Sequence, residues 1–344
     1  MTGNSLGEFY FQWHITQRCN LRCRHCYHDS YDGANELTPD QLTLVFHRLE
    51  GALRQWQRPG SASLTGGEPF IRREDLFRLA ELMDRSDWFT YYDVLTNGSL
   101  LSGGDLQRLD RLSKLRRVQL SLESPYREVN DVIRGTGSFD TTVSAIRELK
   151  GHGFQVSVMM TASKLNNDHV PEMIRFLEDE GVDAFAVERF VPEGSGAEVR
   201  ELVLSRDDAA ALFKTVHAFG TGTRRIRVLM HRPLFCLIDA EDSTVGAMCS
   251  VGTNALTIMH DGTLYPCRRL PIPIGNVLTD GVFKAWYDSD VLWSVRNPSN
   301  LKGKCGACEL APLCRGCRAM AYCITGDYLE EDPHCWKHAD MSTN

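Results

Sequence analysis

The stretch Cys19-Asn-Leu-Arg-Cys23-Arg-His-Cys26-Tyr27 decides how this sequence is interpreted, and it follows an apolar, strand-like segment from Phe9 to Ile15. Thiols this close in sequence either share a metal or pair as disulfides, and soft sulfur ligands select zinc, Cu(I) or iron–sulfur clusters. A structural zinc site normally has four protein ligands, whereas three thiolates on a cubane cluster leave one iron for a small molecule. The odd number of cysteines therefore favours a cluster with one open position, and a zinc site completed by His25 is the alternative.

Charge and cysteine usage indicate a cytosolic protein that uses its thiols for metal binding. The chain has 344 residues, 12 cysteines and a formal net charge of −7. No apolar run approaches the length of a membrane span, and residues 1–8 lack the apolar core of a signal peptide. Many cysteines without an export signal are typical of a reducing compartment. We therefore expect a cytoplasmic protein, and the negative charge gives no general case for a nucleic-acid or membrane partner.

Strand-like and helix-like segments alternate along the first two thirds of the chain, which implies a parallel sheet with helical crossovers. Ser205 is placed to cap a further helix through Phe219, and Gly194-Ser195-Gly196 is expected to be a linker or an insertion. Beyond Leu234 cysteines become dense and helical periodicity weakens, so we predict a barrel domain over 9–233 and a second domain over 234–344. Strands are expected at 9–15, 61–65, 89–95, 117–122, 155–161 and 184–190, and helices from 38, at 74–85, 102–115, 139–151 and 168–180.

The cysteine run resembles the signature of the radical S-adenosylmethionine (SAM) family, in which three and then two residues separate the cysteines and an aromatic residue such as Tyr27 follows. In that family the open iron of a 4Fe-4S cluster chelates SAM, and reduction cleaves SAM to a 5′-deoxyadenosyl radical that abstracts a substrate hydrogen. The resemblance implies an α/β fold, a TIM-like partial (β/α)6 barrel that is open on one side, with its site at the strand C-terminal ends. It also implies an external electron donor of flavodoxin or ferredoxin type. With three cysteines in place, His25 is expected to face solvent.

Residues for SAM itself are expected at the ends of the early strands. Gly66, Gly67, Glu68 and Pro69 follow a strand, where a glycine pair permits close backbone approach and Glu68 can accept hydrogen bonds from an ammonium. The family places such a motif against the methionyl amino group. Arg134 resembles the arginine that pairs with the SAM carboxylate, a role suited to a bidentate donor. The other cofactor-binding candidates are Tyr27, which would pack on adenine, and Asn97, Ser121 and Glu123. No catalytic residue is assigned.

A second group of cysteines lies near the C-terminus, after an expected hairpin of 256–259 and 263–266 that turns at His260-Asp261-Gly262. Taken alone, the two Cys-x-x-Cys pairs are compatible with a zinc ribbon. The region resembles the SPASM extension of radical SAM enzymes, which carries two auxiliary iron–sulfur clusters. The resemblance gives one cluster Cys305, Cys308, Cys314 and Cys335, and gives the other Cys249, Cys267 and Cys317.

The chain departs from the SPASM pattern, because two residues rather than three separate Cys314 from Cys317. The fourth ligand of the Cys249 cluster is therefore unassigned, and Cys236, Cys323 and an open iron are the alternatives. Arg268 and Arg269 follow Cys267 directly. They are expected either to grip substrate carboxylates, from an acidic peptide or from porphyrin propionates, or to be a solvated basic pair.

The motifs together predict a radical SAM enzyme that oxidatively modifies a ribosomal peptide or a partner protein, for example by a cross-link or a thioether. A haem-pathway oxidative decarboxylase of tetrapyrroles, or another small-molecule cofactor maturase, is the alternative. A non-catalytic metal scaffold is a remote one, because it leaves Gly66 to Pro69 unexplained. Since the first strand begins by Phe9, a peptide-recognition module is expected to be a separate protein.

Overall fold

A computed structural model describes residues 7–222, 224–230, 232–239 and 249–337 of the chain. Its strands form one sheet in the order β10-β9-β8-β1-β2-β3-β4-β5-β6-β7. Neighbouring strands from β1 to β7 are parallel, as the alternation predicts. The strands are β1 (Phe9–His14), β2 (Gly60–Thr65), β3 (Phe89–Thr96), β4 (Leu115–Ser121), β5 (Val156–Ala162), β6 (Ala184–Arg189) and β7 (Arg227–Leu229).

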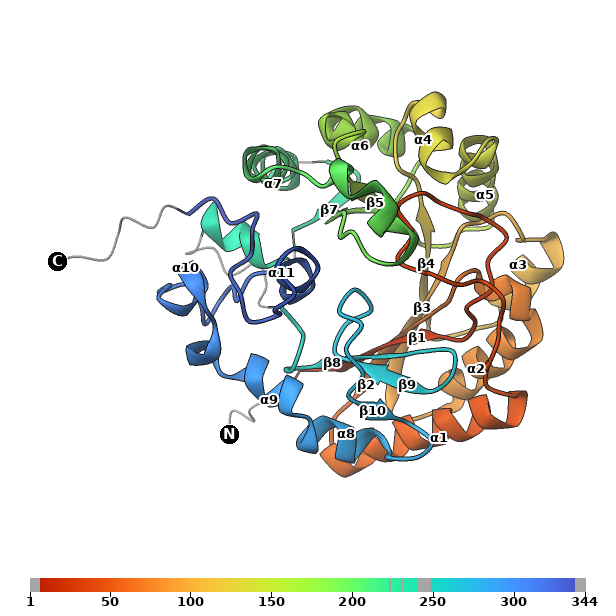
Figure 1. Cartoon of the computed structure of the whole chain (residues 1–344). Coiled ribbons are helices and arrows are strands. Elements are labelled where there is room, and N and C mark those ends of the chain that lie inside the picture. The colour runs from red at the N-terminus through yellow and green to blue at the C-terminus, as the bar shows by residue number, and fades with distance from the viewer. Residues whose placement is uncertain (1–6, 223, 231, 240–248, 338–344) are drawn as a thin grey trace, which may run out of the picture.

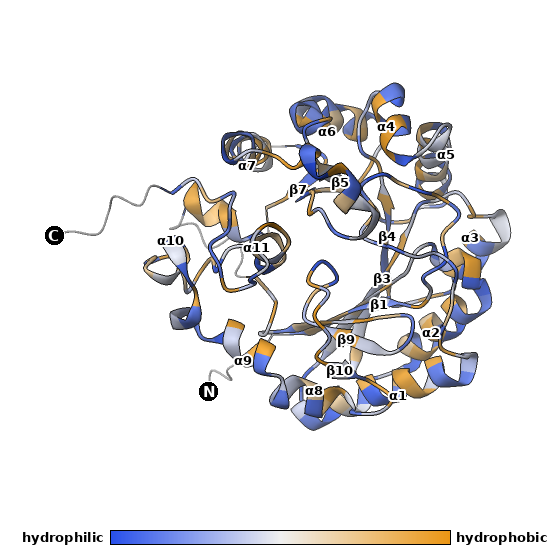
Figure 2. Cartoon of the chain, viewed as in Figure 1, coloured by the Kyte–Doolittle hydropathy of each residue, from blue (hydrophilic) through white to orange (hydrophobic). Residues whose placement is uncertain are grey.

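Helices cover the outer face of this curved sheet and leave its inner face to the functional loops (Figure 1). Along β1, Phe9, Phe11 and Trp13 are fully buried against the helices, and the residues between them face the inside of the barrel. Figure 2 shows apolar and polar residues alternating along α1 and α2, as an amphipathic helix on a sheet requires. The helices are α1 (Pro39–Trp56), α2 (Arg73–Arg85), α3 (Gly103–Leu109), α4 (Arg127–Arg134), α5 (Ser138–Gly151), α6 (Val170–Asp179) and α7 (Arg206–Gly220).

Two expectations for this half of the chain are wrong in detail. The helix expected over 102–115 ends at Leu109, because Asp84 accepts hydrogen bonds from the backbone of Ser113 and Lys114 and holds that segment as a turn before β4. Of the two alternatives for Gly194 to Gly196, the linker is wrong, since these residues begin the 3-10 segment η3 (Gly194–Leu202), which packs on the cysteine loop, and the insertion stays a prediction. Shorter 3-10 turns are η1 (Pro69–Arg72), η2 (Asn167–His169), η4 (Pro233–Leu237) and η5 (Pro298–Asn300).

The C-terminal region extends the same sheet and lies along its open side. The expected hairpin is present as β8 (Ala255–Ile258), which is parallel to β1, and β9 (Thr263–Tyr265), which pairs antiparallel with β8 and with β10 (Gly275–Asn276). The helix α8 (Val282–Asp288) packs beside α1, and α9 (Asp290–Arg296), α10 (Gly303–Gly306) and α11 (Arg318–Thr325) follow the open side of the sheet (Figure 1). The predicted division at 233/234 thus falls within one continuous sheet and stays a prediction.

A buried ion pair joins the end of β6 to the C-terminal region. Arg189 donates two parallel hydrogen bonds to Asp332, at 3.0 and 2.9 Å, and the two side chains are 8% and 0% exposed. Burial alone would raise the pKa of Asp332, but the guanidinium of Arg189 outweighs it and lowers that pKa to about 2. Asp332 also accepts from the backbone N–H of Cys317, so the pair positions one predicted cluster ligand.

We expect Asp332→Asn to lower the free energy of unfolding by about 3–5 kcal/mol, because it leaves the buried charge of Arg189 without its partner. Denaturant unfolding at pH 7 under anaerobic conditions measures this change. Asp327→Asn removes the partially exposed partner of the exposed Lys302 and serves as the control, for which we expect almost no effect. Equal stabilities of the two variants would contradict the anchoring role of Asp332.

Candidate iron–sulfur and SAM site

The three N-terminal cysteines lie on the loop that connects β1 to α1. The sulfurs of Cys19 and Cys26 accept hydrogen bonds from the backbone of Leu21 and His28, both at 3.4 Å. Burial, together with the other cysteines, raises the pKa of Cys19 to about 11, and burial also raises the pKa of Cys23. A bound cation reverses this preference because a coordinating thiol is deprotonated. The loop is therefore suited to a metal centre.

Among the described residues, no three histidine, cysteine or acidic side chains lie close enough to hold a single metal ion. A cubane cluster sets a different condition, because each cysteine binds its own iron. The Nε2 of His25 lies 3.2 Å from a carboxylate oxygen of Glu123, and His25 belongs to no group of three potential ligands around a single ion among the described residues. The three cysteines fit a cluster better than they fit zinc.

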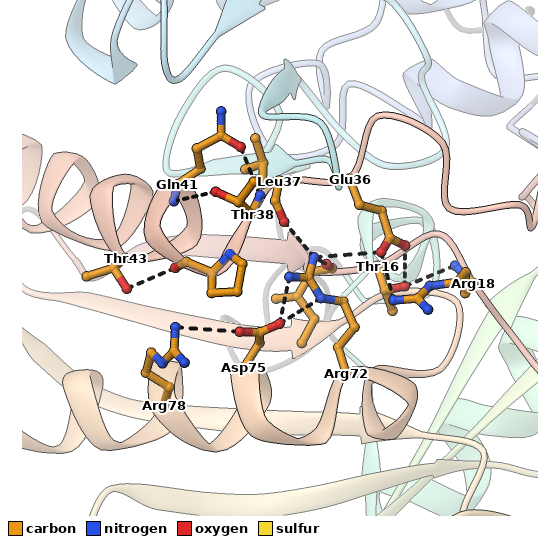
Figure 3. A network of polar contacts seen from close by, with 12 residues as sticks. Thr16, Arg18, Glu36, Leu37, Thr38, Gln41, Thr43, Arg72, Asp75 and Arg78 are labelled. Atoms are coloured by element: carbon orange, nitrogen blue, oxygen red, sulfur yellow. Dashed lines mark hydrogen bonds and ion pairs between the residues drawn. The ribbon is translucent and has the colours of Figure 1, made fainter.

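The start of the cysteine loop is held by the carboxylate of Glu36 (Figure 3). It accepts hydrogen bonds from the hydroxyl of Thr16 at 2.5 Å, the backbone of Gln17 at 2.9 Å and the guanidinium of Arg18 at 3.0 Å. Arg72, which follows the glycine motif, lies 3.7 Å from the same carboxylate and donates to the backbone carbonyls of residues 15 and 37. The network ties both ends of the loop to the segment after β2.

The glycine pair after β2 is required by a close backbone approach. A Cβ on Gly66 would lie 2.5 Å from the carbonyl oxygen of Thr16, and one on Gly67 would lie 2.3 Å from that of Arg18. Where the two segments meet, the backbone N–H of Gly67 donates to the carbonyl of Thr16 at 2.9 Å, and that of Glu68 donates to the carbonyl of Arg18 at 2.8 Å. The motif therefore docks directly on the cysteine loop, which the sequence argument had not identified.

Glu68 is fully buried and already has protein partners. Its carboxylate accepts from the backbone of Phe70 at 3.1 Å, the hydroxyl of Thr96 at 2.7 Å and the backbone of Asn97 at 2.8 Å. The side-chain amide of Asn97 in turn donates to Asn20 at 3.0 Å and lies 4.0 Å from the sulfur of Cys19. Glu68 thus joins the end of β3 to the cysteine loop, and its contact with SAM stays a prediction.

Glu123, Arg134 and His25 form a buried group behind the cysteines. One oxygen of Glu123 lies 2.9 Å from Arg134 and 3.2 Å from His25, and the other accepts from the backbone of Thr161 at 2.7 Å. Burial alone would raise the pKa of Glu123, but His25 and Arg134 lower it below the ordinary range. The expectation that His25 faces solvent is wrong, because this ion pair draws it inward. Ser121, the last residue of β4, lies nearby and half-buried.

The far end of the cysteine loop packs on residues from distant parts of the chain. The guanidinium of Arg268 lies 4.5 Å over the ring of Tyr27 and donates to its carbonyl oxygen at 2.8 Å. Gly196 donates to the carbonyl of Cys26 at 2.8 Å, and Gly194, at φ +57°, leaves no room for a side chain against Tyr27. Arg268 is therefore no solvated residue, and the contact of Tyr27 with adenine stays a prediction.

The C-terminal cysteines separate into two groups. Cys305, Cys308, Cys314 and Cys335 line one cavity of about 290 Å³, as the SPASM pattern implies. Cys236 contacts the sulfur of Cys314 and therefore lies beside this cavity.

The second group is Cys249, Cys267 and Cys317. Burial, with the nearby thiols of Cys317 and Cys267, raises the pKa of Cys249 to about 11. The backbone carbonyl of Cys249 accepts a hydrogen bond from Arg315 at 2.6 Å. Beside this trio Arg269 is half-buried and lies 3.0 Å from Glu188, so the expectation of a solvated basic pair is wrong for it too.

The fold and the site define a class of protein: a partial α/β barrel with a three-cysteine cluster loop at the C-terminal ends of its strands and a cysteine-rich extension on its open side. The comparisons with known proteins agree. The radical SAM superfamily model matches residues 13–177, and the SPASM iron–sulfur cluster-binding domain matches 249–318. The chain belongs to the radical SAM superfamily and carries a SPASM domain, which binds iron–sulfur clusters.

Curated relatives align along almost the whole chain. The AdoMet-dependent heme synthase of Methanosarcina barkeri is 29% identical, over 94% of this chain and 95% of the relative. The mycofactocin maturase MftC of Mycobacterium tuberculosis is 30% identical, over 94% of this chain and 81% of the relative. The prediction of a radical SAM enzyme, rather than a non-catalytic scaffold, is confirmed.

Solved structures confirm the fold. Streptococcus suis SuiB bound to its precursor peptide SuiA superposes with a TM-score of 0.74 at 17% identity, over 96% of this chain and 76% of that structure. The enzyme anSMEcpe with bound AdoMet gives 0.73 at 18% identity, over 95% and 94%. Within the described residues no helix has both the length and the apolar character that a membrane crossing requires.

We expect Gly67→Ala to prevent assembly of the N-terminal cluster, because the new Cβ displaces the backbone of the cysteine loop at Arg18. Iron per chain after anaerobic reconstitution, and the change that SAM induces in the paramagnetic spectrum of the reduced protein, measure the loss. Gly51→Ala, which has open space around it within α1, is the matched control and should retain both. Full iron and an intact SAM response in Gly67→Ala would contradict the docking role.

We expect the stability of the protein to fall as the pH drops from 7 to 5, in part through His28. Burial and the charge of Arg268 lower the pKa of this histidine from 6.5 to about 3, and its Nε2 lies 3.1 Å from the carbonyl of Gly66. The unfolded chain takes up a proton below pH 6.5 and the folded chain does not. The contribution of His28 is therefore complete above 6.5 and is lost toward 3, by about 1.4 kcal/mol per pH unit.

Anaerobic unfolding at pH 7, 6 and 5 checks this, and His28→Gln should flatten the slope. His47→Gln, on the exposed face of α1, is the control and should keep the slope of the unaltered protein. Parallel curves for all three proteins would refute the assignment.

Proposed function

We propose that this radical SAM enzyme oxidatively modifies a ribosomally made peptide or a partner protein, by a cross-link, a thioether or a similar maturation. When bound, the cluster and SAM supply a 5′-deoxyadenosyl radical that takes a hydrogen atom from a substrate C–H bond. The protein then has to bind the substrate, orient one of its carbons and exclude water. The observation that carries the proposal is the polar lining of the barrel interior directly below the cysteine loop.

Along the barrel strands, polar side chains that face the interior alternate with apolar side chains that face the helices. Tyr10 on β1 donates to Ser63 on β2 at 2.8 Å, and Asp93 on β3 lies 3.1 Å from Arg117 on β4. Such a wall offers hydrogen-bond donors and acceptors with little exposed hydrocarbon. It suits a peptide segment, whose amide groups need partners once they leave water.

The charges at the far side of the barrel interior are also compensated. Glu188, which precedes the last residue of β6, pairs with Arg269 and with Arg232. Burial alone would raise the pKa of Glu188, yet the two guanidinium groups lower it to about 2. Because these arginines already have a carboxylate partner within the protein, a substrate carboxylate there would have to share or displace Glu188. This arrangement supports recognition through shape and amide groups more than through a strong net charge.

In this proposal SAM is held by the residues grouped around the cysteines. Arg134 would pair with the SAM carboxylate, since its Nε has no hydrogen-bond partner among the described residues. The motif from Gly66 to Pro69 would contact the methionyl end, and Tyr27 would pack on the adenine. Asn97, Ser121 and Glu123 end neighbouring strands on the same side and complete the set.

The remaining components are the clusters and their partners. Cys19, Cys23 and Cys26 would ligate the SAM cluster, and the two C-terminal groups would ligate auxiliary clusters that accept the electron left after hydrogen abstraction. An external donor of flavodoxin or ferredoxin type would supply the reducing electron. A separate recognition protein would present the peptide, and the reaction would take place in the cytoplasm.

A haem-pathway step on a tetrapyrrole is the second candidate, and two observations favour it. The relative named AdoMet-dependent heme synthase aligns over 95% of its own length. His14, at the end of β1, is fully buried, and neither of its ring nitrogens has a hydrogen-bond partner among the described residues. An imidazole in this position could ligate the iron of a substrate porphyrin.

The first test uses SAM alone. Anaerobically reconstituted protein with dithionite and SAM should release 5′-deoxyadenosine, and Cys23→Ala should abolish it while the fold, measured by circular dichroism, persists. Absence of 5′-deoxyadenosine from the unaltered protein would overturn the cleavage reaction.

The second test separates the substrates. Mass spectrometry of candidate precursor peptides after co-expression should show loss of hydrogen that localises to one residue and requires Cys23. Unmodified peptides, together with loss of carbon dioxide from an iron porphyrin carrying propionates, would replace peptide maturation by the haem-pathway reaction.

A further inference from the structure

The cluster assigned to Cys249, Cys267 and Cys317 lacks a fourth protein ligand in the sequence pattern. We propose that Cys323 supplies it. The inference rests on the proposed auxiliary clusters and names the ligand that completes one of them.

Cys236 is placed against the other cluster. It lies in η4, where its neighbours Leu234 and Leu237 line the cavity formed by Cys305, Cys308, Cys314 and Cys335. Its side chain contacts the sulfur of Cys314 and is buried to 5% exposure. A cavity with four cysteines of its own needs no further ligand from this turn. Cys236 therefore cannot serve the Cys249 group without leaving its place in the core.

Cys323 lies with the incomplete group. Cys317 caps the N-terminus of α11, and Cys323 follows on the same helix. Both sulfurs, and that of Cys267, pack around one small apolar cluster that contains Leu270 and Met320. Two of the three assigned ligands thus share their immediate surroundings with Cys323. The thiol is half-buried, where a ligand sulfur is shielded from water and oxidants.

Glu193 and Arg200 hold Cys323 in place. The sulfur lies 3.3 Å from a carboxylate oxygen of Glu193, and Arg200 donates to the backbone carbonyl of Cys323 at 2.5 Å. Only the thiolate is a metal ligand, so ligation replaces the S–H bond by an iron–sulfur bond and releases one proton, with no change in electron count.

Glu193 also connects Cys323 to the N-terminal cysteine loop. It directly precedes Gly194, which contacts Tyr27, and Gly196 two residues further on donates to the carbonyl of Cys26. The proposed fourth ligand therefore hydrogen-bonds to the loop that clamps the SAM cysteines. Loss of this ligand should affect the auxiliary cluster first and leave the N-terminal cluster in place.

The test compares Cys323→Ala with Cys236→Ala, both reconstituted anaerobically as full-length protein. With SAM bound to the open iron of the N-terminal cluster, Cys323→Ala should lose about one iron atom per chain and, after mild oxidation, give the paramagnetic signal of a three-iron cluster that the unaltered protein lacks, since an iron without a protein ligand is released most readily. Cys236→Ala should keep the iron content and spectrum of the unaltered protein. The change that SAM induces in the N-terminal cluster should persist in both variants, which shows that they are folded.

Cys323→Ser supplies a second readout. A serine oxygen in place of sulfur should keep four irons and shift the reduction potential of one auxiliary cluster. Full iron in Cys323→Ala with no three-iron signal, or an unchanged potential in Cys323→Ser, would overturn the assignment of Cys323. Unaltered protein with iron for a single cluster would instead overturn the auxiliary clusters themselves, so the two failures are distinguishable.

Discussion

The close approach of two backbones is the constraint on which the site depends. The turn after β2 lies directly on the loop after β1, and a Cβ on Gly66 or Gly67 would lie only 2.5 or 2.3 Å from a carbonyl oxygen of that loop. Parallel pairing of β1 and β2 brings both strand ends to the same edge of the sheet. The cysteine loop has little regular structure of its own and takes its shape from this neighbour. Any side chain in the glycine pair would move the cysteines.

Buried charges around the loop are arranged in pairs that hold it from several sides. Glu36 binds its start, Glu123 holds His25 in its middle, and Arg268 covers Tyr27 at its end. Burying a charge is costly unless it has a partner. Glu36 and Glu123 have arginine partners, and Arg268 has the ring and the carbonyl oxygen of Tyr27. A network of this kind stabilises one loop geometry in preference to others. It thereby fixes where a cluster and its small-molecule ligand would sit relative to the barrel interior.

The βα alternation, the cysteine run and the C-terminal hairpin could be predicted, because each depends on local pattern and spacing. Helix caps such as Thr38, and apolar periodicity, place an element to within a few residues. The inward position of His25, the docking of Gly194 on Tyr27 and the burial of Arg268 could not be predicted in this way. Each depends on a residue about a hundred or more positions away, and a local pattern carries no signal for such contacts.

The same limit applies to the cysteines. Spacing alone left Cys236 and Cys323 equivalent as ligands. The fold distinguishes them, because η4 lines the cavity of one cysteine group and α11 begins at Cys317 of the other. The C-terminal region is also attached to the barrel, since β8 pairs with β1 and Arg189 on β6 anchors Asp332 beside Cys317. The N-terminal cysteine loop and the C-terminal cysteine groups are therefore attached to one sheet, which fixes their separation across the barrel interior. An electron that leaves a substrate radical in that interior would have an acceptor at a set distance, which an extension joined by a flexible linker would not provide.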